Sequence, residues 1–154
     1  MITLRHPDSP QLWNIARRLV EEYAGSLDVD LSFQDFGREL THLEVEYSAP
    51  AGRFLLAEDQ GAFVGCGAIR RFSESACEMK RLYVSPRAQG RGVGRMLVTA
   101  LLDEARALGY QAMLLDTLPS MRGAQQLYRS LGFKPVEPYR FNPVPGTIFL
   151  QLDL

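Results

Sequence analysis

The sequence is poor in several features that mark specialised classes of protein. It has two cysteines and two histidines in 154 residues, so neither a disulfide framework nor a Cys/His metal site is expected. Its net charge of −1 provides no general attraction to nucleic acid. No apolar run approaches the roughly 20 residues that a membrane-spanning helix needs. These absences favour a compact protein in which Cys66 and Cys77 are reduced core residues.

Nothing in the sequence divides the chain into parts. There is no internal repeat, no low-complexity stretch and no linker, and the length suits one domain, so we expect a single domain over residues 1–154. Residues 1–7 lack the layout of a signal peptide, and we therefore expect a cytoplasmic protein.

Hydrophobic periodicity predicts an α/β chain that begins with a strand and two helices. Antiparallel hairpins follow, and then a strand–helix–strand crossover. The predicted strands are 2–5, 53–58, 62–72, 77–84, 111–116, 133–136 and 148–152, and the predicted helices are 10–25, 33–47, 92–108 and one that starts after Ser120.

Some details of these elements can be checked against a structure. Gly37 weakens helix 33–47 by roughly 1 kcal/mol relative to alanine, so we expect that helix to be kinked or mobile. Ser120 is expected to cap the helix that follows it, and Met96 to pack inward on helix 92–108. Gly65 and Gly67 predict that another backbone or side chain comes close to their strand.

The most unusual stretch runs from Arg87 to Arg95, between a predicted strand and a predicted helix. Gly90, Gly92 and Gly94 suit neither element, but they allow backbone N–H groups to approach a ligand closely. The first N–H groups of the helix lack internal partners, and together with the helix dipole they make an anion site. Arg87, Arg91 and Arg95 add positive charge. We therefore predict a phosphate or pyrophosphate ligand, with a glycine-rich turn that binds nothing as the alternative.

Residues 70–95 are locally cationic, with seven basic side chains against two acidic ones. In an otherwise acidic chain, this concentration favours a compact polyanionic ligand over a long polyanion.

Two common phosphate motifs do not match this loop. A Walker A loop requires Gly-Lys-Ser/Thr, and the dinucleotide fingerprint requires G-x-G-x-x-G. The loop instead resembles the Q/R-x-x-G-x-G/A motif of the GNAT superfamily of N-acetyltransferases, read as Gln89, Gly92 and Gly94. Residues 124–133 resemble the A-x-x-L-Y-x-x-x-G-F motif of the later helix of the same family. One departure is Met121, which stands where many members carry an asparagine that contacts coenzyme A.

The resemblance implies a fold, a cosubstrate and a reaction. The expected fold is the single-domain GNAT acyl-CoA N-acyltransferase fold, which is α/β (α+β), with a mixed, mostly antiparallel sheet of about seven strands and helices on both faces. The expected cosubstrate is acetyl-CoA, with no metal, and the expected reaction is direct attack of an amine in a ternary complex. The resemblance also implies a homodimer.

The resemblance assigns the cofactor contacts residue by residue. The backbone of Leu82, Tyr83 and Val84 would hold the pantetheine arm, with ordinary ladder pairing as the alternative. The pyrophosphate would bind the loop residues Gln89, Gly90, Arg91, Gly92, Val93, Gly94 and Arg95. Tyr128 would contact the cosubstrate and protonate the departing thiolate, because a phenol can donate a proton to sulfur. Its alternative role, as a core aromatic, is compatible with this one.

Glu78 is the candidate general base. It precedes Gln89 by eleven residues, a spacing that histone-type members share. The acceptor must lose a proton, and a partly buried carboxylate can accept it. The alternatives are a structural ion pair with Lys80, Arg81 or a residue on an adjacent strand, and a mechanism in which water takes the proton.

The acceptor is the least determined part of the prediction. Six carboxylates lie between Asp28 and Glu46, in a region that borders the acceptor site in this fold, and they either attract a cationic amine or form a solvated helix face. A compact chain favours a small-molecule amine, with no nucleic acid or membrane partner. The alternatives are a protein lysine or N-terminus as acceptor, and a non-catalytic acyl-CoA-binding sensor.

Overall fold

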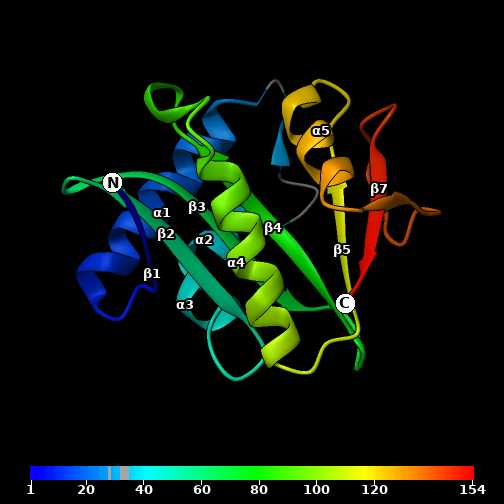
Figure 1. The fold of residues 1–154 in the computed structure, drawn as a ribbon, viewed down its shortest axis with the longest axis horizontal. Coiled ribbons are helices and arrows are strands. Elements are labelled where there is room, and N and C mark those ends of the chain that lie inside the picture. Colours follow the sequence, from blue (N-terminus) through cyan, green and yellow to red (C-terminus); the bar gives the residue numbers. More distant parts are fainter. Residues whose placement is uncertain (28, 32–34) are drawn as a thin grey trace.

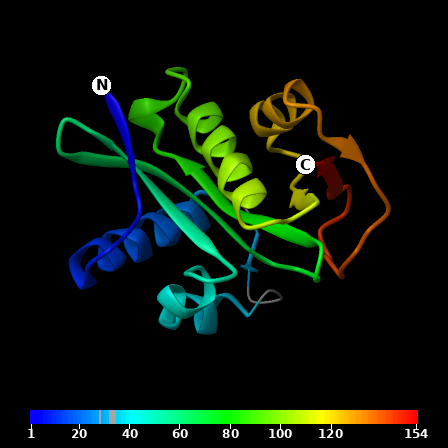
Figure 2. The ribbon, with the colours of Figure 1, turned by 60° about the horizontal axis from the view of Figure 1, so that its bottom comes forward.

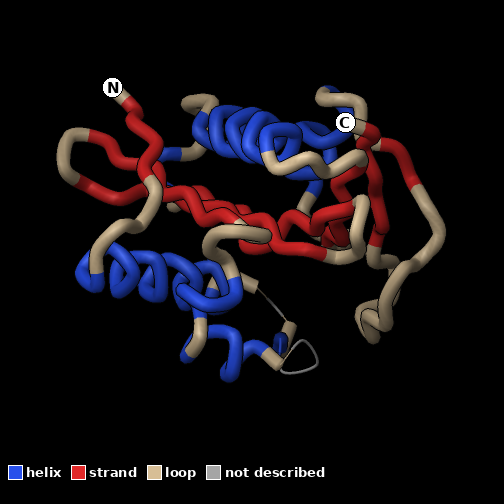
Figure 3. The backbone as a smooth tube through the Cα atoms, turned by 90° about the horizontal axis from the view of Figure 1, so that it is seen from below, coloured by secondary structure: helices blue, strands red, loops and turns tan. Residues whose placement is uncertain are grey.

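One seven-stranded sheet organises the chain, and helices cover both of its faces (Figures 1 and 3). The computed structural model describes residues 1–27, 29–31 and 35–154. Its strands are β1 (Ile2–Arg5), β2 (Arg53–Asp59), β3 (Ala62–Arg71), β4 (Ala76–Val84), β5 (Ala112–Thr117), β6 (Lys134–Pro135) and β7 (Ile148–Asp153), and its helices are α1 (Pro10–Gly25), α2 (Phe36–Thr41), α3 (Leu43–Glu46), α4 (Val93–Ala107) and α5 (Arg122–Ser130).

The strand order is β1-β2-β3-β4-β5-β7-β6. Strands β1 to β4 pair antiparallel with their neighbours, β4 pairs parallel with β5, and β7 pairs antiparallel with both β5 and β6. The single parallel pair is joined by α4, as a crossover connection requires. The predicted mixed, mostly antiparallel sheet is therefore confirmed, and Figure 2 shows it from a second direction.

The sheet separates two hydrophobic cores. One lies beneath α4 and α5 and includes Leu97, Leu101 and Met113. The other lies beneath α1 and α3 and includes Leu19, Leu43 and Phe54. Cys66 and Cys77 are buried and form no disulfide, as predicted. Among the described residues, no helix combines the length and the apolar character that a bilayer crossing requires.

Local signals in the sequence predicted several boundaries correctly. Ser9 caps α1 by accepting the Leu12 N–H at 3.2 Å, and Pro10 occupies the first turn. A Cβ on Gly65 would lie 2.8 Å from the Tyr83 carbonyl oxygen, and one on Gly67 would lie 3.0 Å from Leu101 Cδ1. Glycine is therefore required at residue 65, where the β4 backbone presses against β3, and at residue 67 a Cβ would crowd the Leu101 side chain of α4, as we expected.

The predicted helix 33–47 is wrong as a single element. Residues 32–34 lie outside the described part of the chain, and the remainder forms two short helices that are separated at His42 and not at Gly37. His42 has φ −114° and ψ 32°, which interrupts the helical hydrogen bonding. Leu43 and Tyr47, which follow the break, lie in the core beneath the sheet.

Two smaller predictions about helices also fail. Ser120 does not cap α5, because the helix begins at Arg122 with Met121 in the cap position and without a side-chain bond. Met96 is 38% exposed. Val98 and Leu102 are buried instead, because the inner face of α4 is rotated relative to the face that periodicity predicted.

A buried ion pair ties α2 to the sheet. Arg81, in a left-handed conformation with φ 60° at a bulge in β4, donates to both Glu39 oxygens at 2.6 and 2.9 Å. Burial alone would raise the pKa of Glu39, but the hydrogen bond and charge of Arg81 outweigh it, and the pKa is lowered.

This lowered pKa predicts a pH dependence of stability. The contribution of Glu39 is present above its unfolded pKa of about 4.3 and is lost as pH falls through the lower folded value. We expect Glu39→Gln to reduce the free energy of unfolding by about 3 kcal/mol at pH 7, and the difference from wild type to shrink below about pH 4. Urea denaturation of both proteins across pH measures it, and a difference that stays constant down to acid pH would contradict the prediction.

Candidate active site

The site is built where two parallel strands separate. Strand β4 pairs with β5 through Ala76–Glu78 and Ala112–Leu114, and beyond these residues the two strands diverge (Figure 1). The gap is part of a cleft of about 600 Å³, lined by Met79–Val84, by the loop before α4, by the end of β5, by α5 and by Tyr23 and Ser26 near the end of α1.

The free side of β4 faces this cleft. Leu82, Tyr83 and Val84 all line it, and within the described residues the ladder with β5 does not extend to them. The Val84 carbonyl already accepts the Gln89 side-chain amide at 3.2 Å. Backbone polar groups along such an edge need another partner, which is the arrangement that an extended ligand arm requires.

The glycine loop forms one end of the cleft. Gly90 and Gly92 have φ of 82° and 79°, and a Cβ on either would meet nothing within 4 Å. The left-handed conformation therefore selects glycine here, and the space in front of the loop is open. The first helical bond of α4 runs from the Met96 N–H to the Gly92 carbonyl at 3.0 Å, so the N–H groups of Val93, Gly94 and Arg95 precede the helix's own pattern.

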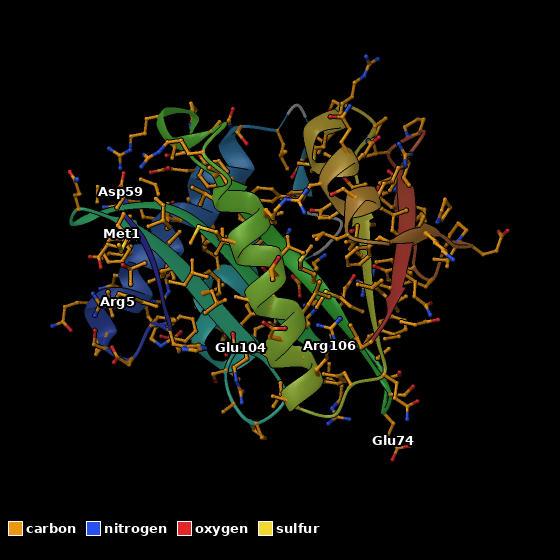
Figure 4. The ribbon with its side chains drawn as sticks, in the orientation of Figure 1. Met1, Arg5, Asp59, Glu74, Glu104 and Arg106 are labelled. Atoms are coloured by element: carbon orange, nitrogen blue, oxygen red, sulfur yellow. The ribbon has the colours of Figure 1, made fainter. Side chains whose placement is uncertain are left out.

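The arginine side chains of the loop lie outside the cleft that other residues of the loop line. Gln89, Gly90, Gly92, Val93 and Gly94 line the cleft, but Arg87, Arg91 and Arg95 do not. Arg91 binds Asp59 at 2.8 Å at the end of β2, where Asp59 also lies beside Met1 (Figure 4). Arg95 binds Ser130 Oγ at 2.7 Å, and Arg87 Nη2 lies 3.4 Å from the Phe63 carbonyl. The predicted role of these side chains as cations facing the anion is thus weakened, whereas Arg122, which sequence reasoning missed, lines the cleft from α5.

Tyr128 lies on α5 in the wall of the cleft. Its ring packs against Phe133 at a centroid distance of 5.7 Å, so it is also the core aromatic that we named as the compatible alternative. Burial first, and then the charges of Tyr23 and Asp116, raise its pKa. The phenol therefore keeps its proton at neutral pH, as a proton donor must.

Glu78 lies apart from the cleft lining and is fully buried. Its Oε1 accepts Arg140 Nη2 at 2.7 Å and Arg70 Nε at 3.4 Å, and its Oε2 accepts the Tyr139 hydroxyl at 2.9 Å. This is the ion pair with an adjacent strand that we kept as an alternative, extended by the β6–β7 connection. A role as general base stays a prediction.

A substitution separates these two roles of Glu78. If Glu78 is structural, Glu78→Gln should lower the free energy of unfolding by about 3 kcal/mol and the melting temperature by roughly 10 °C. If it is also the base, turnover per folded molecule should fall in addition by about 100-fold.

Calorimetric melting and coenzyme A release, measured on the same preparation, distinguish the two outcomes. Tyr139→Phe is the matched control, because it removes one bond to Glu78 but leaves the carboxylate and both arginines. We expect it to cost only about 1 kcal/mol of stability.

The cleft contains charged groups that sequence reasoning did not assign to it. Asp116, the residue before the last of β5, lines the cleft, with Oδ2 accepting the Asn142 side-chain amide at 3.2 Å. Lys80 also lines the cleft and is 5% exposed. Burial lowers the pKa of Lys80 to about 8, although Glu78 and Asp116 partly oppose the shift. The sequence did contain a signal for Asp116, because an acidic residue at the end of the predicted buried strand 111–116 is a candidate site residue.

The acidic segment before β2 is largely neutralised. Glu39 binds Arg81, Glu46 binds Arg70 at 2.7 Å, and Glu44 binds Arg17. Asp28 lies outside the described residues. These pairs weaken the hypothesis that the segment attracts a cationic acceptor. Within the part of the chain that the structure describes, no cluster of His, Cys, Asp and Glu could hold a metal ion.

A splayed parallel strand pair, a glycine loop at a helix N-terminus and a buried tyrosine in the gap together define the acyl-CoA N-acyltransferase fold. A family model described as the acetyltransferase (GNAT) family matches residues 12–133. The chain belongs to this family and is an acetyl-CoA-dependent N-acetyltransferase.

Known proteins are similar over nearly the whole chain. An uncharacterised N-acetyltransferase of Schizosaccharomyces pombe is 40% identical over 147 residues, which cover 94% of this chain and 90% of that protein. An acetyltransferase structure from Streptococcus agalactiae has a TM-score of 0.81 at 22% identity and covers 99% of this chain and 98% of its own. A GNAT acetyltransferase from Elizabethkingia anophelis, solved with acetyl-CoA bound, has a TM-score of 0.68 at 21% identity. The match covers 100% of this chain and 97% of that one.

Proposed function

We propose that this protein transfers an acetyl group from acetyl-CoA to the primary amine of a small molecule, by direct attack within a ternary complex. The observation that carries the proposal is one continuous cleft, which joins the open N-terminus of α4 to Tyr128 along the unpaired edge of β4. The neighbour solved with acetyl-CoA bound supports the choice of cosubstrate.

The residues present fit this cosubstrate. The uncapped N–H groups at the start of α4 and the open space at Gly90 and Gly92 suit a pyrophosphate. The backbone of Leu82–Val84 would hold the pantetheine arm. Bound acetyl-CoA supplies an activated thioester, so the protein's main task is to orient the acceptor amine against it.

Proton transfers complete the proposed mechanism. Tyr128 would donate a proton to the sulfur that departs, because its phenol is protonated at neutral pH and lines the cleft. Glu78 or water would take the proton of the amine, as the resemblance implies. Asp116 is a second carboxylate for this role, and it lines the cleft whereas Glu78 does not.

Calorimetry and an amine panel test the proposal. Acetyl-CoA should bind with one site per chain, and a small-molecule amine from a panel of amino acids, polyamines and aminoglycosides should accelerate the release of coenzyme A. Binding without release for any amine would favour the non-catalytic sensor. Faster release with lysine-containing or N-terminal peptides than with small amines would favour a protein acetyltransferase.

Two further expectations belong with this proposal. A homodimer, implied by the family resemblance, would be tested by light scattering after size-exclusion chromatography. A cytoplasmic location would be tested by fractionation of the source cells.

A further inference from the structure

The cleft contains an amine of its own. Lys80 lies on β4 immediately before the bulge at Arg81, and it is one of the residues that line the cleft although only 5% of it is exposed. Leu82–Val84, the stretch proposed to run beside the pantetheine arm, follows it directly. Lys80 is therefore at most about 13 Å along the strand from Val84, at about 3.3 Å per residue, on the side away from the glycine loop.

A lysine at residue 80 can do chemistry that an arginine there could not do. Lys80 and Lys134 are the only lysines in a sequence with 17 lysine and arginine residues. Arginine cannot lose its proton in a protein, whereas a buried lysine can become a neutral nucleophile. The neighbouring cation, Arg81, keeps its proton as an arginine and so cannot serve in this way.

We propose that Lys80 is an internal acceptor, and that the enzyme acetylates this side chain when acetyl-CoA is bound and no external amine is present. The inference rests on the proposed binding of acetyl-CoA in the cleft. The neutral Nζ attacks the thioester carbonyl carbon, the C–N bond forms and the C–S bond breaks. The thiolate takes a proton from Tyr128, the nitrogen releases its proton to solvent, and Tyr128 regains a proton from solvent.

The product is an amide and so differs from an acyl-enzyme intermediate. An amide does not pass its acetyl group to a second amine under these conditions, so the modified chain is a dead end. It has lost one positive charge beside Glu78 and Asp116 and carries an acetyl group inside the cleft. Self-acetylation should therefore switch off turnover, and an external acceptor should protect the enzyme by competing for the thioester.

The charged neighbours of Lys80 predict how the reaction depends on pH. Glu78 on the same strand and Asp116 on β5 favour its ammonium form, whereas burial, Arg81 and Arg70 on β3 favour the neutral amine. With the pKa lowered to about 8, the rate should rise between pH 6 and pH 8 and level off above roughly pH 9.

The test is mass spectrometry on the full chain incubated with acetyl-CoA alone. Intact mass gives the number of acetyl groups, and peptide mapping separates Lys80, Lys134 and the amino terminus. Lys134 is exposed on β6 and reports acetylation by solution chemistry. We expect Lys80 to be modified at least about 10-fold faster than Lys134, with a rate that saturates as acetyl-CoA increases. Lys134→Arg should leave the Lys80 rate unchanged.

Calorimetry on the same sample separates this inference from the proposed function. If acetyl-CoA binds but Lys80 reacts no faster than Lys134, self-acetylation is wrong and the proposed function stands. If acetyl-CoA does not bind, both are wrong. Protein unfolded in urea should lose the preference for Lys80, and a preference that survives unfolding would also overturn the inference.

Discussion

Gly92→Asp should abolish tight binding of acetyl-CoA and leave the protein folded. Gly92 precedes α4 with φ 79°, and a Cβ there meets nothing within 4 Å. Aspartate tolerates the left-handed conformation better than most residues, so its main effect is a carboxylate at the mouth of the proposed pyrophosphate site. Two like charges about 5 Å apart cost about 3 kcal/mol at an effective dielectric constant of 20. The dissociation constant from calorimetry should therefore rise by about 100-fold.

Gly92→Asn is the matched control for this variant. It has nearly the same shape and the same backbone strain but no charge, so it should weaken binding by less than about 10-fold. Both variants should melt within a few degrees of each other. Equal losses of affinity in the two variants would mean that shape at residue 92, and not its charge, controls binding, and the anion site would have to lie elsewhere.

Tyr128→Phe should reduce kcat by about 100-fold with little effect on the KM for acetyl-CoA. The substitution removes the hydroxyl that we propose donates a proton to the leaving sulfur, but it keeps the ring that packs against Phe133. Because the pKa of Tyr128 is raised, wild-type kcat should show no loss from deprotonation of this residue below about pH 10. Release of coenzyme A at saturating acetyl-CoA, with the best amine of the panel, measures the effect.

Tyr110→Phe provides the comparison for this second variant. Tyr110 is a buried tyrosine outside the cleft, and its hydroxyl donates to the Ala51 carbonyl at 2.7 Å. Losing that bond should cost about 1 kcal/mol of stability without changing kcat. A Tyr128→Phe enzyme that keeps more than about a third of wild-type kcat would assign the residue to the core alone.

The fold was predictable because its signals are local. Alternating apolar residues and turn glycines predicted all seven strands, and Ser9 with Pro10 predicted the start of α1. The prediction failed where tertiary contacts outweigh local preference. Helix 33–47 breaks at His42, and Leu43 and Tyr47 beyond the break lie in the core. Periodicity along one helix did not reveal the break.

The site residues were also predictable where their signals are local and not where they depend on distant parts of the chain. The glycine loop and the motif around Tyr128 are short stretches that could be recognised from residue type alone. The loop needs glycine for its positive φ angles, and the motif needs apolar residues for packing. The partners of Glu78 are different, because Tyr139 and Arg140 lie 61 and 62 residues further along the chain. Without knowledge of where the β6–β7 connection lies, the sequence left the choice between a base and an ion pair open.

The amino-acid sequence alone indicated the family, the succession of strands and helices along the chain and the loop that faces the proposed cosubstrate, since each depends on residues close together in the chain. Only the tertiary structure decided that β4 and β5 separate after Glu78 and Leu114. It also decided that Lys80 and Asp116 line the resulting cleft while Glu78 is enclosed by arginines. The reason is physical: burial and charge pairing depend on the register and divergence of strands far apart in sequence, and no local pattern encodes them.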